Sequence, residues 1–202
     1  MRGLIIKDFL MLKQQVRVLL TIMAIWVVIS VIGKNPSTMT FVIFFSAIML
    51  PISGLSYDEY SKWNEVVFTM PIKPKDVIKS KYIVGIGFIV IAVAVSSILS
   101  IIMGNLILAK LNLLFIPAGI IFLSIMFPLL FKFGTEKSRL ISMSVMMLPT
   151  IIFMIFAQMG YLDHLNMKIL MKWLPYCFLV VSLSCLAISY KVSLNIFEKK
   201  EY

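Results

Sequence analysis

Six apolar stretches, each long enough to cross a lipid bilayer as a helix, dominate this sequence. The hydrocarbon core of a bilayer is about 30 Å thick, so a crossing helix needs about 20 mostly apolar residues. We expect crossings at Val16–Ile32, Met39–Ser56, Tyr82–Ala109, Leu113–Phe131, Leu140–Gly160 and Trp173–Lys191. The 202-residue chain is 61% hydrophobic, whereas soluble domains are about 45–50% apolar. The sequence therefore predicts one all-α membrane domain over residues 1–202, with six transmembrane helices.

The positive charges predict the side of the membrane that each loop faces. If the N-terminus is cytosolic, only four of the 19 Lys and Arg residues lie on the outer side, namely Lys34, Lys110, Lys168 and Lys172. Lys and Arg in short loops resist translocation and collect on the cytosolic side. We therefore expect both termini in the cytosol. This topology also accounts for the net charge of +10, so no nucleic-acid partner is needed to explain it.

The first 17 residues predict an amphipathic helix that lies in the membrane interface. Its apolar face repeats at helical spacing through Ile5, Phe9, Leu12 and Val16, and its flanking cations are Arg2, Lys13 and Arg17. Such a helix can rest at headgroup level with its cations near anionic lipid. The alternative is a plain cytosolic extension of the first crossing.

Residues 57–81, between the second and third crossings, combine charged and aromatic side chains in a way that a simple connecting loop does not need. We predict a short helix that Asp58 or Glu59 caps and that runs to about Thr69, because carboxylates satisfy the free N–H groups at a helix start. Its aromatic and apolar face comprises Tyr60, Trp63, Val67 and Phe68. Pro74 then suits the first turn of the next helix. We interpret this cytosolic loop as a docking surface for another protein. The alternative is a helix resting on lipid, with Trp63 as its anchor.

Small residues four positions apart mark one face of the third crossing: Ala92, Ser96, Ser100 and Gly104. Such a stripe lets two helices approach closely within a membrane. It predicts either packing inside one subunit or a contact between two copies of the chain. By contrast, all nine Asp and Glu residues fall outside the expected crossings. Because buried ionisable residues usually mark ion pathways, this distribution argues against an ion-coupled carrier.

Three segments of the chain resemble small bacterial ABC-2 type permeases. They are Leu4-Ile5-Ile6-Lys7-Asp8-Phe9-Leu10 at the start, Tyr57-Asp58-Glu59-Tyr60-Ser61-Lys62-Trp63 with Phe68-Thr69-Met70-Pro71-Ile72 in the loop, and Asp76-Val77-Ile78-Lys79-Ser80-Lys81-Tyr82 after it. Met70 departs from the family pattern, in which leucine is commoner. The resemblance implies a single ABC-2 type transmembrane domain in a bacterial plasma membrane. It also implies a homodimer of this subunit, paired with two copies of a separate ABC ATPase subunit that binds ATP and Mg.

The same resemblance implies that residues 59–68 form the coupling helix that sits in the ATPase. The candidate coupling residues are Asp58, Glu59, Lys62, Trp63, Glu65, Val67 and Phe68. Within the family the chain looks most similar to exporters of amphipathic peptides, such as phenol-soluble modulins or antimicrobial peptides. A permease for lipid or drug is the alternative cargo class, because an apolar interior without fixed charge suits either.

The sequence carries no phosphate-binding loop of the type G-x-x-x-x-G-K-[ST], so we expect ATP hydrolysis to come from the partner and expect no cofactor, metal site or catalytic residue on this chain. An intramembrane enzyme is disfavoured because the only histidine, His164, lies in an outer loop beside Asp163. The remaining alternative is a secondary carrier or membrane scaffold that works without an ATPase.

Overall fold

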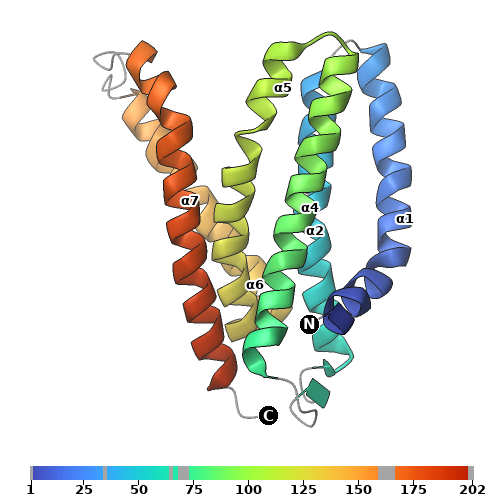
Figure 1. The fold of residues 1–202 in the computed structure, drawn as a ribbon. Coiled ribbons are helices and arrows are strands. Elements are labelled where there is room, and N and C mark those ends of the chain that lie inside the picture. The colour runs from blue at the N-terminus through green and yellow to red at the C-terminus, as the bar shows by residue number, and fades with distance from the viewer. Residues whose placement is uncertain (1, 34–35, 64–65, 68–72, 159–166, 200–202) are drawn as a thin grey trace.

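The computed structural model describes residues 2–33, 36–63, 66–67, 73–158 and 167–199. Within these ranges the chain is all-α, as the sequence predicts (Figure 1). Its helices are α1 (Arg2–Ile32), α2 (Pro36–Tyr60), α4 (Pro74–Ile102), α5 (Leu106–Asn112), α6 (Phe115–Gln158) and α7 (Met167–Glu198).

Four helical segments in the described ranges are long and apolar enough to cross a membrane: Ser37–Tyr60, Pro74–Ile102, Leu106–Ser138 and Pro175–Glu198. A fifth candidate is α1, whose segments Ile6–Lys13 and Val16–Ile32 meet at a bend of 55°. The bend falls where the predicted interfacial helix gives way to the first crossing. The expected fifth crossing, Leu140–Gly160, is helical as far as Gln158. The total of six crossings stays a prediction.

The helix of the third crossing begins where the sequence predicts but ends earlier. Helix α4 starts at Pro74, in the first-turn position that suits proline. It stops at Ile102, because Gly104 adopts a φ of +77°, the left-handed conformation that commonly terminates helices. Asn105 then caps α5, its side chain accepting a hydrogen bond of 3.0 Å from the backbone N–H of Leu108. The predicted boundary at Ala109 is therefore wrong.

The break that the sequence predicts between Phe131 and Leu140 is confirmed. Helix α6 contains a kink there, where Gly134 has φ +76° and ψ 179°. Figure 1 shows that α6 runs to this kink and then turns back toward the other end of the bundle, behind α7.

Both chain ends lie at one end of the bundle, beside the connection between α2 and α4 (Figure 1). We call this the terminal end. The three segments that the sequence assigns to one side of the membrane therefore lie together.

The helices that flank the terminal end share an apolar core, in which Ile78, Ile89 and Phe127 are fully buried. Two glycines let α4 and the first half of α6 approach closely. A Cβ atom on Gly119 would lie 2.8 Å from the side chain of Ile89, and one on Gly85 would lie 3.1 Å from the ring of Phe127. These contacts set the separation of the two helices, as small residues do in membrane interfaces.

Candidate functional site

Four charged side chains from three helices meet at the terminal end, and we call them the charge cluster: Lys7 and Asp8 of α1, Asp58 of α2 and Lys81 of α4. Lys81 Nζ donates to Asp8 Oδ1 at 2.6 Å and also to Asp58. Lys7 Nζ donates to Asp58 Oδ1 at 2.5 Å and lies 3.6 Å from Asp8 Oδ1. Asp8, Asp58 and Lys81 are buried. The cluster thus joins α1, α2 and α4 by charge-assisted hydrogen bonds.

The charge cluster is electrically balanced, with two cations and two anions. Buried charges persist when they are paired and hydrogen-bonded, and an unpaired one is strongly destabilising. Lys7, which precedes both the bend of α1 and the expected crossing Val16–Ile32, is the most exposed member. Burial lowers the pKa of Lys7 and the positive charge of Lys81 lowers it further, whereas the hydrogen bond to Asp58 raises it. Lys7 Nζ also lies 3.9 Å from the ring centroid of Trp63, a cation–π contact.

Asp8 Oδ2 is a buried carboxylate oxygen with no hydrogen-bond partner among the described residues. A cavity of about 10 Å³ lies beside it, lined also by Lys81, Pro51 and Gly54. That volume corresponds to about one water molecule, so the cluster closes around a very small space.

Tyr82, the residue after Lys81, connects the start of α4 to the other half of the bundle. Its hydroxyl hydrogen-bonds the hydroxyls of Ser189 and Ser193 on α7, at 2.6 Å and 2.9 Å. Its ring packs edge-on against Phe127 of α6, with centroids 4.8 Å apart. Two consecutive residues of α4 therefore contact four other helices.

Glu59 connects the end of α2 to the kink of α6. Its Oε2 accepts a hydrogen bond of 2.7 Å from the backbone N–H of Thr135, the first residue after the kink. A carboxylate in this position satisfies a free N–H group at a helix start and suits the positive end of the helix dipole. Glu59 therefore acts as a cap supplied by another helix.

The Gly134→Ala substitution is expected to destabilise the protein by about 1–3 kcal/mol, because Gly134 has φ +76° and ψ 179°, a combination that essentially only glycine adopts. An added Cβ would also meet the carboxylate of Glu59 and displace it from Thr135. The thermal unfolding midpoint in detergent measures the change. Gly87→Ala is the matched control, because Gly87 is helical and a Cβ there meets nothing within 4 Å. Equal midpoints for the two variants would contradict the assigned kink.

The predicted capping role of Asp58 and Glu59 at the start of a new helix is wrong. Helix α2 continues through Tyr60, so both residues lie in its last turn. The chain leaves the helix at Ser61 and at Lys62, which has a φ of +52°. Because no Gly or Pro interrupts residues 55–60, α2 can extend past the expected Ser56.

The other predicted coupling residues differ in their exposure. Trp63 is half-buried and packs against the core, Val67 is 2% exposed, and Lys62 is exposed. Glu65 and Phe68 lie outside the described residues. Among the residues of this region that the structure describes, the exposed apolar and aromatic side chains are Tyr57, Tyr60 and Val66.

The predicted stripe is reduced to three members. Ala92, Ser96 and Ser100 are buried within this single chain, and Ser100 Oγ accepts a hydrogen bond from Asn112 Nδ2 of α5 at 3.1 Å. Gly104 lies beyond the end of α4, so it cannot share the helical face. The burial of these three residues within one chain favours the first predicted alternative, packing inside one subunit.

The charge cluster was not predicted from the sequence, because Lys7 and Lys81 were assigned to membrane topology, Asp58 to capping and ATPase coupling, and Asp8 to no site. Their pairs are separated by up to 73 positions, so no local periodicity brings them together. The three segments that resemble ABC-2 type permeases nevertheless all contribute to the charge cluster. The first supplies Lys7 and Asp8, the second supplies Asp58, and the third supplies Lys81.

The arrangement offers mechanical connection between helices. The described residues contain no group of three or more His, Cys, Asp or Glu that could hold a metal ion. The charge cluster, Glu59 and Tyr82 together tie the end of α2 and the start of α4 to α1, α6 and α7. A force applied where α2 ends would therefore reach all of these helices.

Residues 3–198 match the model of a protein family described as ABC-2 family transporter protein. No curated protein and no solved structure matches the chain.

Proposed function

The chain belongs to the ABC-2 transporter family, as a membrane component that works with an ABC ATPase, and we propose that it exports amphipathic peptides. In this proposal two copies of the chain pair with two ATPase subunits in a bacterial plasma membrane. The terminal end faces the cytosol, because 15 of the 19 Lys and Arg residues are expected there.

The single observation that supports transmission of force is the set of contacts at the end of α2. Asp58 is buried and hydrogen-bonds to α1 and α4, whereas Glu59 is exposed and hydrogen-bonds to α6; Tyr60 beside them is 74% exposed. We infer that the coupling region has two faces. Tyr57, Tyr60, Lys62 and Val66 would contact the ATPase. Asp58, Glu59, Trp63 and Val67 would pass the movement on, and Glu65 and Phe68 stay candidates for either role.

The cargo proposal rests on where the fixed charges lie. Along α4 every charged residue falls in the first eight positions, from Pro74 to Lys81, and the following 21 residues carry none. A path lined by such helices suits an amphiphile better than a sugar or an ion, since a buried polar cargo would find no charged partner there.

The test is to co-express the chain with its ABC ATPase subunit, purify the complex in lipid nanodiscs and measure ATP hydrolysis. We expect amphipathic helical peptides to stimulate hydrolysis several-fold, while scrambled peptides of equal composition do not. Stimulation by phospholipids or drugs alone would overturn the peptide assignment. Transport by the purified chain without any ATPase would instead establish a secondary carrier and overturn the proposal.

A further inference from the structure

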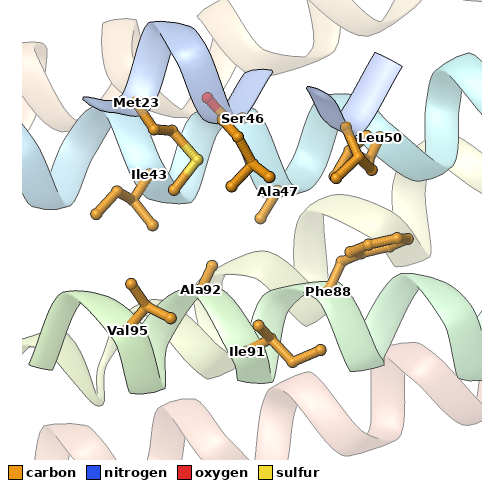
Figure 2. A pocket seen from close by; sticks show the side chains of 11 residues that line it. Met23, Ile43, Ser46, Ala47, Leu50, Phe88, Ile91, Ala92 and Val95 are labelled. Carbon is orange, nitrogen blue, oxygen red and sulfur yellow. The ribbon is translucent and has the colours of Figure 1, made fainter. Parts of the chain in front are cut away.

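An apolar groove of about 200 Å³ lies between α1, α2 and α4, away from the charge cluster. Figure 2 shows side chains of α2 and α4 facing each other across it, with Met23 reaching in from α1. Ser46 is the only polar residue among the 11 that line it. The two small residues Ala47 and Ala92 leave the space between the helices open.

The groove opens toward the surface that faces lipid. Three of its lining residues are among the exposed large apolar side chains, with exposed fractions of 57% for Leu20, 55% for Ile91 and 38% for Val95. Ile91 and Val95 lie in α4, which is long and apolar enough to cross the membrane, and Leu20 lies in the bent candidate span of α1. The molecules that reach this opening are therefore the hydrocarbon chains of the bilayer.

The shape of the groove suits a slender ligand. Along α1 it extends from Val16 to Met23, which corresponds to about 10 Å of helix. Its volume is below the range of about 300–1,000 Å³ that is typical of sites for drug-sized ligands. Part of a straight alkyl chain fits these dimensions, and a polar headgroup would find only Ser46 inside.

Two exposed cations lie close in the sequence to Val16, which lines one end of the groove. Lys13 lies just before the bend of α1, and Arg17 follows Val16 directly. The bend places this end of the groove where the crossing meets the interfacial segment. Cations at that level attract anionic headgroups, and Arg binds phosphate with bidentate geometry.

We propose that the groove between α1, α2 and α4 binds one acyl chain of an anionic phospholipid, whose phosphate lies at Lys13 and Arg17. The lipid comes from the leaflet at the terminal end and is a bound component of the subunit rather than its cargo. This inference is independent of the proposed peptide export.

The first test fills the groove. The full-length chain is purified from nanodiscs that contain equal amounts of phosphatidylglycerol and phosphatidylcholine, and retained lipid is counted by native mass spectrometry. We expect one retained phosphatidylglycerol per chain. The Ala92→Phe variant should lose it, because an aromatic ring from α4 would occupy the groove. Ala187→Phe, at an exposed position of α7, is the control and should retain the lipid.

The second test removes the cations. Arg17→Gln and Lys13→Gln should each lower the preference for phosphatidylglycerol over phosphatidylcholine about fivefold, in line with the attraction of one cation near a membrane surface. Lys110→Gln, an exposed cation on α5, should leave the preference unchanged.

Retention of phosphatidylglycerol by Ala92→Phe at the wild-type level would overturn the proposal. If that variant does not fold, Ala47→Leu fills the groove from α2 and decides the question by the same measurement. If the groove-filling variant forms less dimer than the wild type but retains as much lipid, a second copy of the chain occupies the groove. That result would also overturn the proposal. Equal retention of both phospholipids by the wild type would refute the anionic specificity.

Discussion

Replacing Asp58 with Ala is expected to cost about 3–5 kcal/mol of folding free energy. The substitution leaves Lys7 and Lys81 with Asp8 as their only acidic partner in the charge cluster, and breaking a buried ion pair from one side has a cost of this size. The free energy of unfolding in detergent micelles, measured by denaturant titration, reports the loss. Glu198→Ala, an exposed acidic residue near the end of α7, is the control and should change stability by less than about 1 kcal/mol.

A second substitution separates the balance of charge from the loss of a side chain. Removing Lys7 together with Asp58 leaves Asp8 and Lys81 as a neutral pair 2.6 Å apart. The Lys7→Ala, Asp58→Ala double variant should therefore be more stable than the sum of the two single effects predicts, which is the signature of contacting residues. Strict additivity would mean that Lys7 and Asp58 do not interact.

Replacing Tyr60 with Ala is expected to weaken binding of the ATPase by about 30-fold, while the subunit itself stays folded. Tyr60 is 74% exposed at the end of α2, and an aromatic residue at the centre of an interface typically contributes 2 kcal/mol or more. The affinity of the purified ATPase for the subunit in nanodiscs measures the effect. Tyr176→Ala on α7, where the side chain is 69% exposed, is the control and should bind normally.

Trp63→Ala should affect the coupling of cargo to ATP hydrolysis and not the binding of the ATPase. Because Trp63 is half-buried and lies under Lys7, its removal should leave ATPase binding within about threefold of normal, while cargo no longer stimulates hydrolysis. If Tyr60→Ala and Trp63→Ala both retain full affinity and full stimulation, the coupling region has been assigned to the wrong residues.

The sequence predicts the helices better than their ends. The break at Gly134 is evident because a glycine interrupts an apolar run and polar residues follow it. Gly104 also follows an apolar run. Because it lies four positions after Ser100, the sequence pattern places it in the small-residue stripe of the third crossing rather than at a helix end. A glycine that ends a helix and one that lets helices approach look alike in one sequence, and the φ angle decides between them. The close approaches at Gly85 and Gly119 were missed for the same reason.

The candidate site was predictable in its location but not in its contacts. The mixture of charged and aromatic residues marks residues 57–81 as important. Which charges are buried depends on pairings such as Lys81 with Asp8, which are distant in the chain and leave no periodic trace. The hydrophobic pattern could not show that Val67 faces inward and Tyr60 outward, because both belong to the same predicted apolar face.

The adjacency of Lys81 and Tyr82 limits how α4 can move. Neighbouring positions on a helix point about 100° apart, so a twist of α4 about its own axis would break the ion pairs on one side or the hydroxyl contacts on the other. We therefore expect the end of each subunit near Lys81 to move as a rigid block. A displacement that opens a passage would then occur toward the opposite end of the bundle or at the boundary between two subunits.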